Sequence, residues 1–160
     1  MRPVALLAII FSATCGASES TSKYVIGVSN ELLAAGSTAL EQGRAEEGIR
    51  LTLEGLKVAA DFHDIAAGHA NLCAGYAMLK QWEQALFECN LSIEIDDGNW
   101  RAFNNRSAVF TATGFYDSAI ADVLAGLKLA PESETLKKSL EIAYEHKRVL
   151  KDRSRGATSA

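Results

Sequence analysis

The chain has 160 residues, of which 48% are apolar and 22% are charged, and its formal net charge is -4. This composition suits one folded domain or a short array of repeats, and it excludes a largely disordered chain. The acidic balance also disfavours nucleic-acid partners, because affinity for a phosphate backbone depends on lysine and arginine.

The N-terminus has the order of a secretory signal peptide. One basic residue is followed by an apolar run at residues 4–11 and then by small residues. This order predicts a signal peptide over residues 1–17 and an exported protein, periplasmic if the host is a Gram-negative bacterium. Two alternatives stay open, a buried N-terminal helix and a lipid attached to Cys15, for which Ser12-Ala13-Thr14 is a poor lead-in. We expect residues 18–28 to form a linker or a helix extension.

Three later segments repeat one spacing of apolar or small residues, which is typical of one face of an α-helix. The members are Ala45, Gly48, Ile49, Thr52, Leu53 and Leu56; Trp82, Ala85, Leu86, Cys89, Asn90 and Ile93; and Tyr116, Ala119, Ile120, Val123, Leu124 and Leu127. Each segment follows another helical pattern. Gly43 and Gly114 suit the left-handed residue that ends a helix, Asn99 suits an N-cap, and Pro131 comes where the last of these helices should stop.

These residues and their period of 34 carry a family resemblance. Residues 100–133 have the pattern Phe103, Ser107, Phe110, Gly114, Tyr116, Ala119, Gly126 and Pro131. Residues 66–99 have Leu72, Cys73, Tyr76, Trp82, Ala85 and Ser92, with Lys80 and Asp97 where glycine and proline are usual. Residues 29–62 keep only the small positions, and His63-Asp64-Ile65 lengthen the next connection. The sequence resembles a tandem of tetratricopeptide repeats, a bacterial exported member of that family.

The resemblance implies an all-α fold with three helix-turn-helix repeats at residues 29–62, 66–99 and 100–133. These repeats would form a short right-handed solenoid over residues 29–133. We expect residues 134–152 to form a capping helix, with Leu136, Leu140, Ala143 and Tyr144 on its packing stripe, because the last repeat needs a cover. Residues 153–160 are expected to be a disordered basic tail.

The resemblance also implies a partner site along the concave face, lined by the first helix of each repeat. Mapped onto this sequence, that groove is Asn30, Leu33, Ser37, Ala67, Ala70, Asn71, Ala74, Met78, Arg101, Asn104, Asn105, Ala108 and Ala112. We expect its alanines to leave room for a peptide whose backbone groups bond the asparagines. A subset of the family clamps the C-terminal carboxylate of chaperone peptides. Only Asn71 and Arg101 match that pattern, so we do not carry the activity over.

The sequence allows two structural interpretations each for Arg106 and for the pair of cysteines. Arg106 takes a position that is normally a buried leucine, so we expect it to extend toward solvent or to pair with an acid such as Asp122. Cys73 and Cys89 fall on the two helices of one repeat. A disulfide is possible in an oxidising compartment, but we favour two small core thiols.

No catalytic constellation emerges from the sequence. His63, His69 and His146 lack the spacing of a metalloprotease pair, and neither a phosphate-binding loop nor a Gly-x-Ser-x-Gly elbow occurs. We therefore predict a non-enzymatic scaffold without metal or cofactor that binds a protein or peptide, and no small-molecule substrate.

The distribution of charge supports an alternative function. Residues 18–136 carry 17 acidic and 8 basic side chains, whereas residues 137–155 carry 7 basic and 3 acidic ones. The alternative is a membrane-associated accessory subunit or assembly factor of an envelope complex, attached through this basic tail or through the lipid on Cys15.

Overall fold

The computed structural model describes residues 30–157, so the predicted signal peptide, the lipid on Cys15 and the linker lie outside the described residues. Within that range the chain forms helices and no strands. The helices are α1 (Glu31–Glu41), α2 (Ala45–Leu56), α3 (Phe62–Met78), α4 (Trp82–Ile95), α5 (Trp100–Thr113), α6 (Tyr116–Leu129) and α7 (Glu134–Ala157). The predicted all-α class is confirmed.

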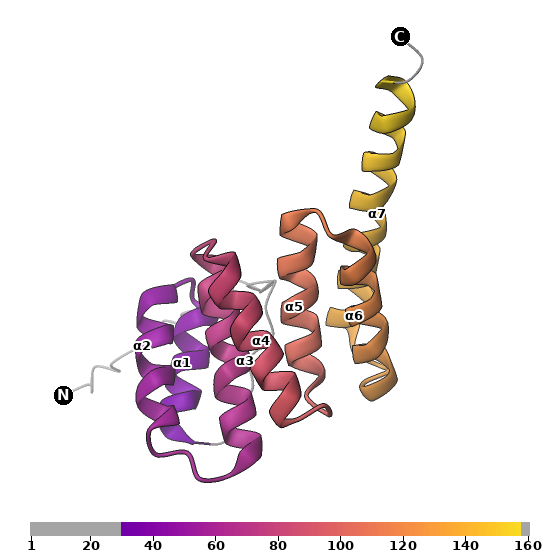
Figure 1. Cartoon of the computed structure of the whole chain (residues 1–160). Helices are drawn as coiled ribbons and strands as arrows, with labels where there is room; N and C mark the ends of the chain where they lie inside the picture. The colour runs from indigo at the N-terminus through magenta and orange to yellow at the C-terminus, as the bar shows by residue number, and fades with distance from the viewer. Residues whose placement is uncertain (1–29, 158–160) are drawn as a thin grey trace, which may run out of the picture.

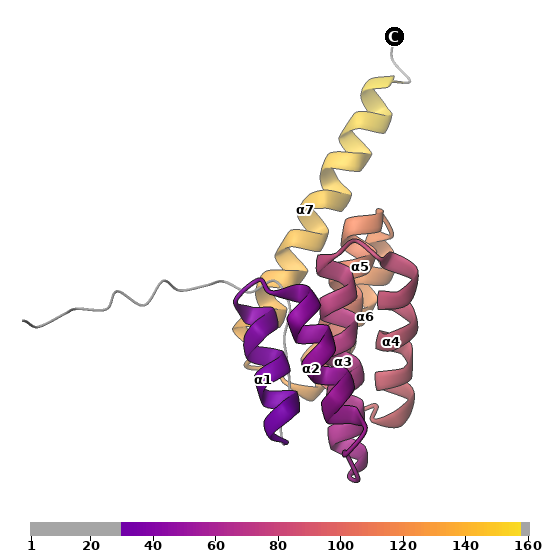
Figure 2. The same cartoon turned by 90° about the vertical axis from the view of Figure 1, so that its left-hand side faces the viewer.

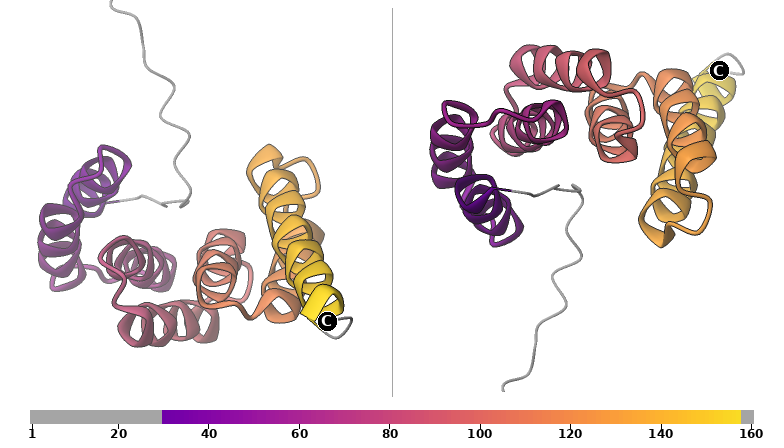
Figure 3. Two further views of the ribbon diagram at one scale, coloured as in Figure 1. Left: turned by 90° about the horizontal axis from the view of Figure 1, so that it is seen from above. Right: turned by 90° about the horizontal axis from the view of Figure 1, so that it is seen from below.

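The helices form three antiparallel pairs, α1 with α2, α3 with α4, and α5 with α6, followed by α7 (Figure 1; Figure 2). Seen along the helices, the pairs follow an arc, with α1 and α7 toward its two ends (Figure 3). Helices α3 and α5 lie on the inner side of the arc, and α4 lies outside them. Each pair leaves part of its apolar stripe for the next pair to cover, which is how a solenoid of repeats is stabilised.

The same turn closes all three pairs. A residue with positive φ follows the first helix of each pair: Gly43 at 78°, Lys80 at 60° and Gly114 at 87°. The next amide then donates to a carbonyl five residues back, as from Arg44 to Ala39 (2.9 Å) and from Phe115 to Phe110 (2.8 Å). The two predicted glycine turns are therefore confirmed.

The helix starts differ from the prediction at two places. His63-Asp64-Ile65 do not lengthen a loop, because they form the first turn of α3. Asp61 caps that helix, and its side chain accepts a 2.8 Å hydrogen bond from the amide of His63. Asn99 occupies the N-cap position of α5 without a side-chain cap, and its amide instead donates to Oγ of Ser92 (3.3 Å).

One pair of positions brings the two helices of each repeat together. A methyl group at Gly36 would lie only 2.4 Å from Oγ1 of Thr52. In the second repeat, the equivalent residues Cys73 and Cys89 form a disulfide, with their Cα atoms 5.2 Å apart. The preference for two thiols was therefore wrong, because two cysteines at such close-contact positions are within bonding reach.

The shared stripe on the second helices is mostly buried, with one consistent exception. Ala85, Cys89, Ala119 and Val123 have no exposed surface. The member eight residues from the start faces outward in all three helices, as Leu53 (42% exposed), Asn90 and Leu124 (43% exposed). These residues therefore lie on the outer surface of α2, α4 and α6.

Helix α7 covers the last pair, as expected of a cap. Leu136 and Ala143 are fully buried, whereas Tyr144 is 51% exposed and does not belong to the packing stripe. The helix continues to Ala157, five residues past its predicted end, so residues 153–157 are not a disordered tail. Within residues 30–157, none of the helices combines the length and the apolar character needed to span a bilayer.

Candidate peptide-binding face

We call the inner side of the arc, where α3 and α5 lie, the concave face (Figure 3). The predicted groove residues lie on α1, α3 and α5 or, for Asn30, at the N-cap of α1. Nine of the thirteen are buried in this structure: Leu33, Ser37, Ala67, Ala70, Asn71, Ala74, Asn104, Asn105 and Ala108. Asn30, Met78 and Arg101 are half-buried and Ala112 is exposed. Whether a peptide binds this face stays a prediction, but the structure shows what most of these side chains do.

Two of the asparagines join the inner helices of neighbouring repeats. The amide of Asn71 donates to the carbonyl of Leu33 (3.4 Å), and the amide of Asn105 donates to the carbonyl of Ala70 (3.0 Å). Both side chains are fully buried. The sequence prediction assigned their hydrogen bonds to a peptide backbone, whereas in the structure these amide groups satisfy carbonyls of the preceding inner helix.

The first repeat contributes structural residues to this region. Leu33 is fully buried, and a methyl group at Gly55 or at Gly68 would lie within 3.3 Å of its side chain. It therefore packs between α2 and α3 and was wrongly assigned to the groove surface. Asn30 caps α1 by accepting from the amide of Leu33 (2.9 Å), and it donates to the carbonyl of Gly55 (3.3 Å).

Helix α7 adds residues to this face that the sequence analysis missed. Oγ of Ser139 donates to Oδ1 of the buried Asn104 (2.8 Å), which places Ser139 against α5. Ile142 (39% exposed) and the exposed His146 lie three and seven residues after Ser139, a spacing that places them on the same side of α7. The spacing of these residues is visible in the sequence, but a capping role for this helix does not by itself predict that they face α5.

Arg101, in the first turn of α5, is a half-buried cation. Its guanidinium lies 4.8 Å from the centre of the Trp100 ring, and its Nε is buried without a hydrogen-bond partner. Within residues 30–157 no carboxylate pairs with it. Burial therefore lowers the pKa of Arg101 below its usual value, although an arginine stays charged at neutral pH.

A second unpartnered donor lies one turn further along α5. Nδ2 of Asn104 is buried without a hydrogen-bond partner. Residues three apart on a helix share a side, so this donor and the guanidinium of Arg101 face the same region. Two unsatisfied donors on one side of a helix favour an anionic or carbonyl group as a ligand, because leaving them unpaired costs free energy.

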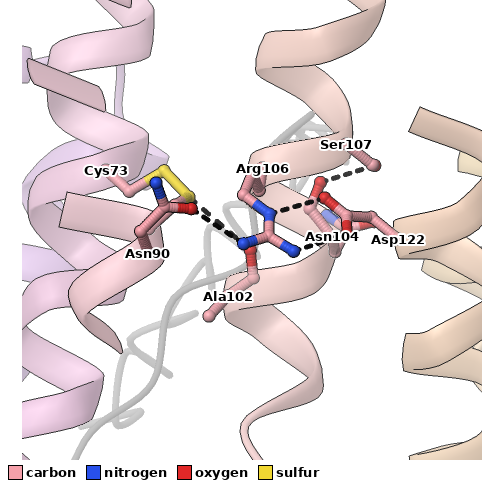
Figure 4. A network of polar contacts seen from close by, with 8 residues as sticks. Cys73, Asn90, Ala102, Asn104, Arg106, Ser107 and Asp122 are labelled. Carbon is pink, nitrogen blue, oxygen red and sulfur yellow. Dashed lines mark hydrogen bonds and ion pairs between the residues drawn. A yellow bond between two sulfur atoms is a disulfide. The ribbon is translucent and has the colours of Figure 1, made fainter. Parts of the chain in front are cut away.

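Arg106 faces away from Arg101 and has a structural role. Its guanidinium donates to both carboxylate oxygens of Asp122 (2.8 and 2.7 Å) and to Oδ1 of Asn90 (2.8 Å) (Figure 4). It also lies 5.8 Å from the Phe103 ring centre. The predicted pairing with Asp122 is confirmed, and Arg106 connects α4, α5 and α6.

Two of the three histidines, His63 and His69, pair with carboxylates. Nδ1 of His69 lies 2.6 Å from the carboxylate of Glu88, and Nδ1 of His63 lies 3.0 Å from that of Asp96. Both pairs tie α3 to the following helix or its end. No group of three metal-ligating side chains comes together within the described part of the chain.

Several solved structures have a fold similar to that of this chain. The first tetratricopeptide-repeat domain of human RPAP3 matches with a TM-score of 0.66 and 21% identity, over 76% of this chain and 93% of that one. The first such domain of Spaghetti (RPAP3), solved bound to the HSP90 peptide SRMEEVD, matches with a TM-score of 0.62 and 23% identity, over 71% and 90%. The Arabidopsis OM64 domain matches with 0.62 and 23%, over 72% and 93%. The chain has the tetratricopeptide-repeat fold.

Sequence comparison is less extensive. No family model matches the chain. Mouse sperm-associated antigen 1 is 24% identical over 127 residues, which are 79% of this chain but only 13% of that protein. The chain therefore corresponds to a small part of that relative.

Proposed function

We propose that this protein is a non-enzymatic interaction module that binds a peptide or an extended segment of a partner protein on its concave face. The observation that carries the proposal is Arg101, a half-buried cation with no carboxylate partner among residues 30–157. A partner with an acidic side chain or a terminal carboxylate would supply the missing anion, and the amide of Asn104 would add a second donor.

The similar structures support the class of partner. The Spaghetti domain is bound to SRMEEVD, and the second RPAP3 domain, with 23% identity and a TM-score of 0.59, is in complex with the HSP70 peptide SGPTIEEVD. Both peptides are acidic at their C-terminal ends. Only Asn71 and Arg101 match the chaperone clamp, and its other positions are Leu33, Ser37 and Asn105 in this chain. We therefore propose recognition of an acidic group at Arg101 without the full chaperone clamp.

Removal of the Arg101 charge tests this proposal. Arg101→Gln keeps much of the side-chain length and removes the cation, so capture of the native partner should fall about 10-fold or more, as expected for a charge-assisted hydrogen bond. Partner capture would be measured by quantitative affinity purification from the native host. Lys128→Gln, at an exposed cation on α6, is the matched control and should leave capture unchanged.

Equal capture of the same partner by wild-type protein and Arg101→Gln would refute the assignment of Arg101. Thermal unfolding of each variant separates this result from a folding defect, because a half-buried cation without a partner should not be needed for stability.

We also propose that the protein is exported, through the signal peptide predicted at residues 1–17. The Cys73–Cys89 disulfide supports this localisation, because disulfides persist in oxidising compartments and are rare in the cytosol. Intact-mass measurement of the native protein should give a chain beginning at Ser18. A mass that includes an acyl group on Cys15 would contradict this cleavage. A mass of the full chain, with residues 1–17 still present, would also contradict it.

A further inference from the structure

Within the described residues, no other helix lies beside the last part of α7 (Figure 1). The ring of His146 lies 5.8 Å from that of Tyr116, and Lys147 pairs with Asp117, so α7 passes the first residues of α6 at this level. The residues that follow, up to Ala157, extend beyond α5 and α6 and project from one end of the molecule (Figure 1; Figure 2).

Apolar side chains are exposed where α7 leaves the body. Val149 is 38% exposed, Leu150 is 53% exposed, and Phe115 in the turn before α6 is 62% exposed. Leu150 lies between two open cavities. One of about 300 Å³ is lined by Tyr116, Glu145, His146, Val149, Leu150 and Arg153, and one of about 730 Å³ includes Phe115, Leu150 and Lys151.

The charge of this region is opposite to that of the body. Residues 147–155 carry five basic side chains and one carboxylate, whereas residues 30–136 carry 16 carboxylates and 7 basic side chains. Lys147 and Arg148 are paired with Asp117 and Glu145. Lys151 and Arg153 are exposed and make no ion pair with any residue between 30 and 157.

We propose that this surface, the α7 tip, made of Phe115, Val149, Leu150, Lys151 and Arg153, docks on an anionic phospholipid membrane. An exposed apolar patch rimmed by cations fits the boundary between head groups and acyl chains. Each cation near such a surface adds electrostatic attraction to the anionic lipids. The acidic body is repelled by the same surface, so the molecule approaches with the projecting tip, and the concave face stays open to a partner.

A flat membrane suits this geometry better than a folded protein. Helix α7 projects past α5 and α6 (Figure 1), and Leu150 and Lys151 line one open cavity together with Phe115, so the patch lies on the surface where α7 leaves the body. An acidic protein would need a hollow that receives the end of α7. The proposal does not depend on the peptide site at Arg101.

Vesicle sedimentation tests the α7 tip. The chain beginning at Ser18 should bind vesicles of phosphatidylcholine with about 30% phosphatidylglycerol. It should bind vesicles of pure phosphatidylcholine at least about 10-fold more weakly, because the cations supply much of the affinity. Binding should weaken as salt rises, because exposed charges are screened. The double variant Lys151→Glu, Arg153→Glu should lose binding to the anionic vesicles.

Two further double variants separate the local charge of the α7 tip from the net charge, and the apolar contribution from the electrostatic one. Lys57→Glu with Lys128→Glu makes the same change in net charge at exposed sites just after α2 and on α6, and this variant should retain binding. Val149→Ser with Leu150→Ser should weaken binding without changing its salt dependence. Absence of wild-type binding, equal binding to both vesicles, or equal loss in the two charge variants would overturn the proposal. Loss of a protein partner by the tip variants, without vesicle binding, would also overturn it.

Discussion

At the scale of single residues, a buried disulfide holds two helices of this fold together. The Cys73–Cys89 disulfide joins α3 to α4 in a cluster with Ala77, Ala85 and Val109. Sγ of Cys89 also lies 3.6 Å from the carbonyl oxygen of Ala102, but an oxidised sulfur has no proton to donate, so this is a packing contact. The disulfide is fully buried, which protects it from reductants while the protein is folded.

Replacing both cysteines by alanine should lower the free energy of unfolding by about 3 kcal/mol. The cross-link closes a loop with a sequence separation of 16, and releasing a loop of that size increases the entropy of the unfolded chain by about this amount. Urea denaturation without reductant would measure the difference. Reductant present during unfolding should destabilise the wild-type protein and leave the double variant unchanged, and equal stability of the two oxidised proteins would contradict the prediction.

At the scale of elements, the three turns show why a degenerate repeat still folds. Gly43 and Gly114 adopt the left-handed conformation that only glycine adopts without strain. Lys80 adopts the same conformation at the equivalent position, 34 residues before Gly114. The hydrogen bond from Gln81 to the carbonyl of Tyr76 (2.9 Å) matches those of the other two turns. Tertiary packing of α3 and α4 therefore determines the turn against local preference.

The strain at Lys80 predicts a stabilising substitution. Lys80→Gly should raise the free energy of unfolding by about 1 kcal/mol, because left-handed strain of about 1–2 kcal/mol is removed and the added freedom of the unfolded chain offsets only part of it. The reciprocal variant Gly114→Lys, at the equivalent turn, should destabilise by a similar amount. Thermal and urea unfolding would measure both, and a destabilising Lys80→Gly would show that the turn is not strained.

The positions of most helices could be predicted from the sequence, whereas one helix start and the disulfide could not. The period of 34 located the helix pairs, because each repeat must present the same small and apolar residues to its neighbours. The start of α3 could not be placed by period alone, since the capping Asp61 adds a turn outside the repeat. The disulfide was underestimated because spacing along a chain does not give the distance between two helices.

At the scale of the whole molecule, the concave face was the least predictable feature. Family positions placed thirteen residues there, but a position on an inner helix does not say whether a side chain faces a partner or a neighbouring helix. Asn71 and Asn105 bond the preceding inner helix, and Leu33 packs beneath the surface. The charge asymmetry between body and tip was visible in composition, whereas its concentration at a projecting helix end required the structure.

We propose that a partner occupies the concave face of the repeat array. Site-specific photocrosslinking in the native host tests it directly, with the photoreactive residue at the exposed Ala112 on α5 or at Leu124, 43% exposed on the outer side of α6. Position 112 lies on the inner helix α5 of the last pair, and position 124 lies on α6. A partner crosslinked from position 112 and absent from position 124 is the predicted result. Crosslinking from position 124 alone would contradict the assignment of the concave face.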